Sequence, residues 1–313
     1  MIIRLEQRFR GESRPLREFG MMPIKLTRRN FIKSLAIGGL AFGLPLKSTN
    51  AIGDSRMSKL MPVLFVGHGS PMNAIEKSRF PETWKKLGQS LPKPSAILCV
   101  SAHWETDDAR VTTSEHPETI YDFWGFPKEL YSITYPAPGS ARLAHSVIDM
   151  FPKGQMSPDP SRGFDHGCWI VLVRMFPEAD IPVIQLSLNQ SLSPQAQYDL
   201  ARNLAPLRQK GVLILGSGNI VHNLGVRRAN GAAPYDWAVE FYSQAKKFIE
   251  KGDHKNLIEY ERLGNAARLS IPSNEHYLPM LYALALREPG ESITFFNEEI
   301  VSGSISMMGF RIG

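Results

Sequence analysis

The chain has 313 residues, 43% of them hydrophobic and 21% charged, which is the composition of a globular protein with a full core. Its net charge of +6 comes from residues 1–51, which hold ten basic and three acidic residues, whereas residues 52–313 hold 26 and 27 and sum to −1. Because the positive charge belongs to the N-terminal segment, we expect no nucleic acid partner.

The N-terminal segment has the pattern of an export signal. The stretch TRRNFIKSLAIGGLAFGLPL places Arg28 and Arg29 before a glycine-rich apolar run over residues 35–46. This order resembles a twin-arginine signal, which sends folded proteins through the twin-arginine export machinery. The run is short for a membrane span. The competing interpretation is a disordered basic tail.

The end of this segment sets the expected domain boundary. Small residues in STNAIG offer a cleavage site after Ala51, so we predict a signal segment over residues 1–51 and one domain over residues 52–313. Residues before Met21 add nothing to the signal, which leaves translation from Met21 or Met22 open. The expected location is periplasmic or otherwise exported.

Apolar runs of strand length alternate with helical patterns along the rest of the chain. The runs predicted as strands are 62–67, 95–101, 182–187 and 211–216. The helical patterns are 77–89, 140–151, 167–176 and 194–209. This alternation predicts a single α/β domain whose central, mostly parallel or mixed sheet is flanked by helices.

Two late segments and two long loops complete the expected organisation. The stretches SITFFNEE and GSISMMGFRIG alternate apolar and polar residues and could form the sheet edge. The segments 104–139 and 217–235 are rich in aromatic residues, proline and glycine, and we expect them to be functional loops.

Three histidines follow directly on predicted strands. His68 comes after VLFVG, His103 after AILCVSA and His222 after the run that ends in GSGNIV. Ligands of an open α/β sheet collect outside the carboxyl ends of its strands, so the three imidazoles are expected at one crevice. Neighbouring imidazoles favour a cation between them, and they suit Fe, Zn, Cu or Ni better than Mg or Ca.

Other chemistries fit the sequence less well. Neither GHGSPMN nor GSGNIVHN matches a dinucleotide or P-loop motif, and no G-x-S-x-G nucleophile elbow or H-E-x-x-H helix is present. Cys99 and Cys168 are too few for a cysteine-rich zinc site, although a disulfide between them after export stays open.

Five further histidines divide into two groups. His166 stands in RGFDHGCW just before a helical pattern, and His276 stands in SNEHYLP at the start of another. His166 is as compatible with helix capping or a hydrogen bond within its loop as with a function, and His276 is as compatible with a residue that only starts a helix. His116, His145 and His254 lie in charged or helical contexts and are expected at the surface.

The chain resembles the 4,5-DOPA extradiol dioxygenase family, a branch of the class III extradiol ring-cleaving dioxygenases. The resemblance covers about residues 61 to 313 and rests on eight blocks in the same order: GHGSPMN, SAHWE, TIYDFWGFP, YPAPGS, GFDHG, ADIPVIQLSL, GSGNIVHNL and EHYLP. It implies a single α/β domain with one non-haem metal ion at the carboxyl ends of the strands.

The resemblance also implies roles for the histidines. His68, His103, His222 and His276 correspond to the metal site, and His166 to the acid–base residue. Catechol and O₂ together take three positions of a six-coordinate iron, so we assign His68, His103 and His222 as persistent ligands. His276 then completes a resting or zinc-loaded form.

Two further predictions concern the surroundings of the metal. Tyr121, Phe123 and Trp124 in TIYDFWGFP are candidates for a wall against a planar ring, or for packing the loop onto the domain. Asp165 is a candidate partner that orients His166, although side chains of adjacent residues usually diverge.

The expected activity is opening of a catechol such as DOPA by O₂ to a semialdehyde. We expect one divalent metal ion, Fe(II) for turnover and Zn(II) in the resting or isolated form. The alternatives are a zinc-dependent hydrolase on the same scaffold and a non-enzymatic metal-binding protein of the cell envelope.

Overall fold

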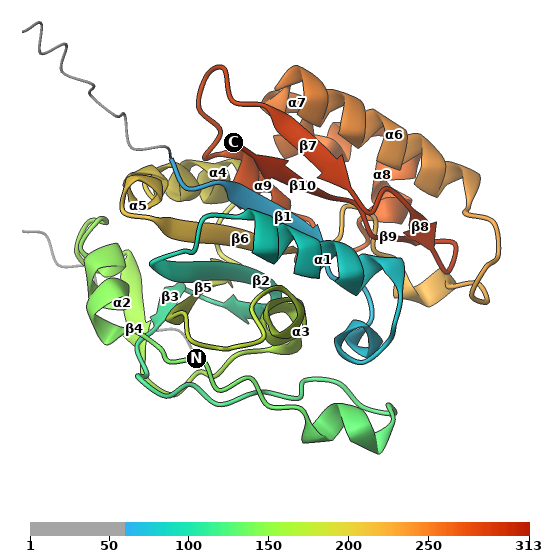
Figure 1. Cartoon of the computed structure of the whole chain (residues 1–313). Coiled ribbons are helices and arrows are strands. Elements are labelled where there is room, and N and C mark those ends of the chain that lie inside the picture. The colour runs from blue at the N-terminus through green and yellow to red at the C-terminus, as the bar shows by residue number, and fades with distance from the viewer. Residues whose placement is uncertain (1–59) are drawn as a thin grey trace, which may run out of the picture. The chain divides into compact units, whose positions relative to one another are not determined.

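The four apolar runs predicted as strands form four neighbouring strands of one sheet in the computed structural model, which describes residues 60–313. They are β1 (Val63–Gly67), β2 (Ala96–Thr106), β5 (Val183–Asn189) and β6 (Val212–Gly218). Their order is β5-β2-β6-β1 and all three pairings are parallel, so their carboxyl ends meet at one edge (Figure 1).

Antiparallel pairs extend this parallel centre on both sides. The full order is β4-β3-β5-β2-β6-β1-β10-β7, with antiparallel pairs β3–β5, β1–β10 and β10–β7. The added strands are β3 (Ala109–Thr112), β4 (Met156–Asp159), β7 (Ile293–Phe296) and β10 (Gly309–Ile312). A separate pair joins β8 (Ile300–Val301) to β9 (Ile305–Ser306). The sheet is therefore mixed, and SITFFNEE supplies an edge strand as expected.

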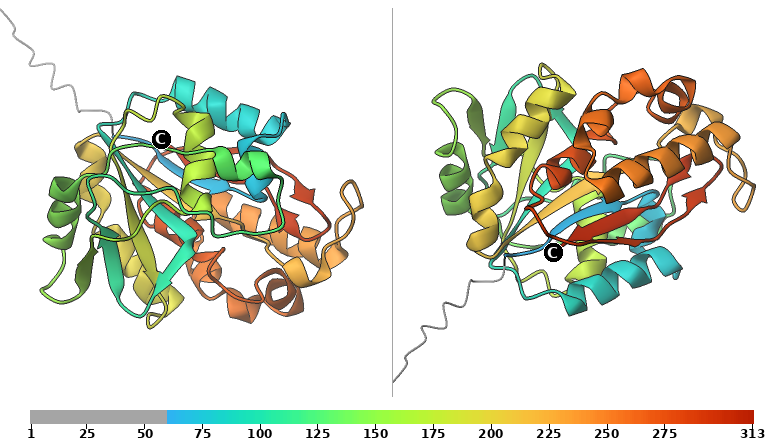
Figure 2. Two further views of the ribbon diagram at one scale, coloured as in Figure 1. Left: turned by 90° about the horizontal axis from the view of Figure 1, so that it is seen from below. Right: turned by 90° about the horizontal axis from the view of Figure 1, so that it is seen from above.

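Helices cover both faces of the sheet (Figure 2). Helices α1 (Arg79–Ser90) and α3 (His166–Met175) pack on one face. The other face is covered by α2 (Ala141–Ile148), α4 (Pro194–Arg202), α5 (Ala205–Gln209), α6 (Asp236–Lys251), α7 (His254–Ile258), α8 (Asn265–Ser270) and α9 (Leu278–Leu284).

This two-sided cover explains why the central strands are continuous apolar runs. In β1, Val63 and Phe65 face the larger apolar layer, whereas Leu64 and Val66 face the layer under α1 and α3. All four side chains are fully buried. A strand that is buried on both faces needs apolar residues at every position, which is the pattern read from the sequence.

The segment 104–139 is more structured than expected. Strand β2 continues to Thr106 after a register irregularity between Val100 and Glu105, and β3 follows at once. A short 3₁₀ helix spans Lys128–Ser132. The prediction of one long loop was therefore wrong in its first part. Strand β3 forms by pairing with β4 and β5, which are distant in the sequence, and the pattern of apolar residues does not reveal such pairing.

The structure bears differently on the predicted signal segment and on the disulfide that the sequence left open. The predicted signal segment, residues 1–51, lies outside the described residues. Cys99 and Cys168 are both buried free thiols and form no disulfide. Within residues 60–313, no helix has the length and apolar character needed to cross a membrane.

Candidate metal centre

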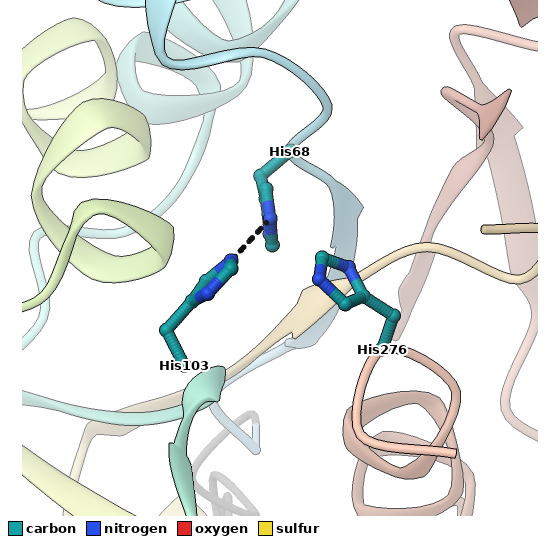
Figure 3. A group of neighbouring side chains, drawn as sticks. All are labelled: His68, His103 and His276. Carbon is teal, nitrogen blue, oxygen red and sulfur yellow. Dashed lines mark hydrogen bonds between the residues drawn. The ribbon is translucent and has the colours of Figure 1, made fainter. Parts of the chain in front are cut away.

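Three histidine side chains point toward one another at the carboxyl edge of the sheet (Figure 3). His68 follows β1, His103 lies near the end of β2 and His276 precedes α9. One ring nitrogen from each lies within 4.8 Å of the others. The Nε2 atoms of His68 and His103 are 3.0 Å apart, which is about the separation of two nitrogens bound at about 2.1 Å to one ion.

The sheet positions these residues through its own hydrogen bonds. The backbone N–H of His68 donates to the carbonyl of Gly218 at 3.1 Å, so β1 stays in register with β6 up to this residue. The Asn73 side chain donates to the His68 carbonyl at 2.9 Å. Directly after β6, the N–H of Asn219 donates to the His276 carbonyl at 2.8 Å.

Neighbouring polar side chains determine which ring nitrogen is free. Ser217 Oγ donates to the Gly167 carbonyl at 2.5 Å, so it can only accept from Nδ1 of His68, 3.0 Å away. Asn219 donates from Nδ2 to the Ser306 carbonyl, and its Oδ1 accepts from Nδ1 of His276 at 3.0 Å. Both imidazoles therefore carry hydrogen on Nδ1 and present the lone pair of Nε2 to the cluster, as metal ligands do.

Burial keeps these rings uncharged. It lowers the pKa of His68 and of His276, and the neighbouring histidines lower both further. Burial and the neighbouring His166 lower the pKa of His103 to about 3, and burial lowers the pKa of His222 to about 4. Neutral imidazoles with converging lone pairs at neutral pH are a donor set that fits a divalent metal ion.

His222 lies beside this group rather than in it. Its ring stacks on His276 with centroids 3.4 Å apart and an interplanar angle of 13°. Its backbone N–H donates to the Ser270 carbonyl at 2.9 Å. The structure thus brings together His68, His103 and His276, whereas the sequence analysis expected His222 beside the first two. Which of His222 and His276 is the third persistent ligand stays a prediction.

His166 is held by a carboxylate that the sequence analysis did not select. Asp122 Oδ1 accepts from the backbone N–H of His166 at 2.9 Å, and Oδ2 lies 2.9 Å from its Nδ1 without the alignment of a hydrogen bond. Oδ2 is also 3.7 Å from Nδ1 of His103. Burial opposes ionisation of Asp122, but contact with His166 outweighs it and lowers the pKa of the carboxyl.

Asp165 does not orient His166. Its fully buried carboxylate caps α3 and accepts hydrogen bonds from Ser101 at 2.6 Å, Gln185 at 2.8 Å and Arg162 at 3.1 Å. The carboxylate therefore faces away from the ring of His166, and adjacent side chains diverge as expected. Asp122 lies in the motif TIYDFWGFP, from which the sequence analysis chose only the aromatic residues as candidates.

The aromatic segment divides between packing and the cavity. Phe123 is buried, meets the ring of His166 edge to face at 5.6 Å and lines the cavity. Trp124 lines the same cavity and is 87% exposed. Tyr121 does not line it, because its hydroxyl donates to the Ile133 carbonyl at 2.7 Å.

A cavity of about 1130 Å³ opens directly over the histidines. Its wall contains all five histidines that the sequence analysis singled out: His68, His103, His166, His222 and His276. Of the other three, His116 and His145 are exposed as expected, and His254 is partly buried with its Nδ1 2.7 Å from the Tyr198 hydroxyl. The cavity has room for an aromatic molecule beside the cluster.

Gly218 allows the His276 segment to approach β6. A Cβ atom at this position would lie 2.1 Å from the His276 carbonyl oxygen, so Gly218→Ala must displace that segment. We expect a loss of about 1–3 kcal/mol in the free energy of unfolding together with weaker metal binding. Thermal unfolding and metal titration measure both. Gly225→Ala, whose Cβ would meet nothing closer than 3.4 Å, serves as the control and should be near neutral.

Fold and site together define a class of protein. An α/β sheet with neutral, converging imidazoles at its carboxyl edge, under a large cavity, is suited to hold a metal ion beside an organic ligand. The family described as the catalytic LigB subunit of aromatic ring-opening dioxygenase matches residues 63–304, and the chain belongs to this family.

Known relatives agree with this membership. A 4,5-DOPA dioxygenase extradiol of Escherichia coli (strain K12) is 43% identical over 274 residues, which cover 85% of this chain and 100% of the relative. One from Beta vulgaris is 41% identical over 229 residues, covering 70% of this chain and 84% of the relative. A crystal structure of an uncharacterized E. coli K12 protein has a TM-score of 0.71 and 39% identity, and covers 81% of this chain and 100% of that chain.

These similarities confirm the resemblance and the fold class read from the sequence. The chain is a metal-dependent aromatic ring-opening dioxygenase of the extradiol class.

Proposed function

We propose that the protein opens the ring of a catechol such as DOPA and forms a semialdehyde. The observation that carries this proposal is the buried histidine cluster at the floor of a 1130 Å³ cavity, in a chain 43% identical to a 4,5-DOPA dioxygenase extradiol. Phe123 and Trp124 give this cavity an aromatic wall suited to a planar ring.

One divalent ion belongs to the proposed site. His68, His103 and His276 would hold it, because their ring nitrogens lie within 4.8 Å of one another, with His222 stacked on His276 as the fourth imidazole. Fe(II) is proposed for turnover and Zn(II) for the resting form, since both accept imidazole ligands. When bound, Fe(II) supplies the electron transfer between catechol and O₂ that the side chains cannot provide.

His166 is proposed as the proton carrier of the reaction. It lines the cavity and contacts the ring of His103, with centroids 3.8 Å apart. Asp122 holds Nδ1 on one side, which leaves Nε2 to accept a proton from a catechol hydroxyl. The same nitrogen can return the proton later in the reaction, because the Asp122 carboxylate stabilises the charged ring in between.

Oxygen consumption tests the proposed function directly. Protein loaded with Fe(II) under argon and then given O₂ and a panel of catechols should take up oxygen and form a yellow semialdehyde with DOPA. Absence of uptake with every catechol would refute it. Activity of the zinc form under argon would support the hydrolase alternative instead, and exchangeable metal without turnover would support the metal-binding alternative.

We also propose that the protein is exported by the twin-arginine route. The support is the sequence alone, with Arg28 and Arg29 before the short apolar run. Replacing both by Lys should leave most of the precursor inside the cytoplasmic membrane, whereas Lys47→Gln, after the run, should not. Immunoblots of fractionated cells measure the distribution. Normal export of the double variant would show that the segment uses another route.

A further inference from the structure

Two consecutive arginines lie in the segment between β6 and α6, and their environments differ. The guanidinium of Arg228 lies 3.7 Å from the centroid of the Tyr235 ring and donates to the Ala233 carbonyl at 2.7 Å. Its backbone N–H donates to the Ser302 carbonyl at 2.8 Å. Arg228 is therefore engaged in fixing the segment itself.

Arg227 lines the cavity over the histidines instead. Its guanidinium forms no hydrogen bond or ion pair within residues 60–313, and it is the only lysine or arginine among the described residues of the cavity wall. His222 lines the same cavity. Arg227 is exposed, so its guanidinium is free to pair with an anion that enters the cavity.

Asn230 offers a second donor on the same segment. It also lines the cavity, and its Oδ1 accepts a hydrogen bond from Ser302 Oγ at 2.9 Å. This contact orients the amide and leaves its Nδ2 group without a bond to another described residue. The Arg227 guanidinium and the Asn230 amide N–H₂ are both hydrogen-bond donors on this wall of the cavity.

The carboxylates of the cavity do not neutralise Arg227. Asp122 faces His166, and Glu299 forms an ion pair with Arg79. Glu76 belongs to the segment before α1 and forms no ion pair with Arg227. Among the described residues of the cavity wall, Arg227 is therefore the one lysine or arginine available to a negative group that enters.

We propose that Arg227, assisted by Asn230, binds a carboxylate on the side chain of the catechol and so determines which catechols are accepted. This inference rests on the proposed function, because it assumes that the catechol ring lies over the histidine cluster. Arg227 acts on substrate selection and takes no part in proton transfer.

The matched ligands are 3-(3,4-dihydroxyphenyl)propionate, which carries the carboxylate, and 4-ethylcatechol, which lacks it. Calorimetric titration of the Fe(II)-loaded protein under argon measures both dissociation constants without turnover. Arg227→Gln should weaken binding of the propionate by about 10- to 100-fold, the worth of a hydrogen-bonded charge pair, and leave 4-ethylcatechol unchanged. Arg227→Lys should lose less, because it keeps the charge but not the planar fork.

The control is Arg202→Gln on the exposed surface of α4, which removes the same charge far from the cavity wall and should alter neither constant. Equal affinities of the unmodified protein for the two ligands, or an equal effect of Arg227→Gln on both, would overturn the proposal. So would failure of the unmodified protein to bind either ligand.

Turnover separates this proposal from the proposed function. With O₂ present, Arg227→Gln should raise KM for the propionate by a similar factor while kcat stays unchanged. If no catechol is cleaved but binding under argon depends on Arg227 as described, the dioxygenase proposal fails and the carboxylate site stands. If catechols are cleaved and Arg227→Gln changes neither KM nor binding, only the carboxylate site fails.

Discussion

His68→Ala and His103→Ala should each lose bound metal and activity together. The Nε2 atoms of the two imidazoles lie 3.0 Å apart, and alanine at either position leaves the coordination shell incomplete. The loss of metal affinity should exceed the roughly 10- to 100-fold expected when the supporting Ser217 is replaced by alanine, since Ser217 only orients the His68 ring.

Measuring bound metal also decides which of the remaining two histidines, His222 or His276, is the third ligand. The ring nitrogen of His276 lies within 4.8 Å of those of His68 and His103, so we expect His276→Ala to release metal and His222→Ala to retain part of it. The reverse result would support the argument from strand ends, which favoured His222. Metal content after dialysis, with circular dichroism to verify folding, gives the answer. The exposed His116 provides the control, and His116→Ala should keep its metal.

His166→Ala should keep its metal and turn over slowly. The ring lines the cavity and is held by Asp122, so its removal should leave the proposed metal ligands in place but take away the proposed acceptor of the catechol proton. Loss of a general base lowers the rate by about 10²- to 10⁴-fold. Asp122→Asn should have a smaller effect, because it removes the charge beside Nδ1 while the ring stays in the cavity.

Single-turnover rates and metal content, measured on the same samples, test this division of roles. Added imidazole should restore part of the rate of His166→Ala, which a merely structural loss would not allow. A metal-free His166→Ala protein would show that His166 is a ligand, and full activity would remove it from the mechanism.

The sequence by itself determined the α/β class and the general place of the site. Strands buried on both faces must be apolar throughout, so β1, β2, β5 and β6 were visible as continuous runs. Parallel strands bring their carboxyl ends to one edge, so residues that follow the runs, such as His68 and His103, were expected to meet there. The α/β class and the place of the site follow from the local residue pattern and from a general rule of topology. Neither inference requires knowledge of how the loops run.

Only the tertiary structure decided which groups meet at atomic distance. Asp122 and His166 are 44 residues apart, and Asn219 and His276 are 57 apart. Tyr121 turns toward Ile133, while Arg227 turns to the cavity and its neighbour Arg228 does not. No periodicity encodes these choices, because they depend on how long segments pack over the sheet once it has formed. Contacts between residues distant in the sequence are fixed by the packing of the whole domain and are not fixed by local residue preferences.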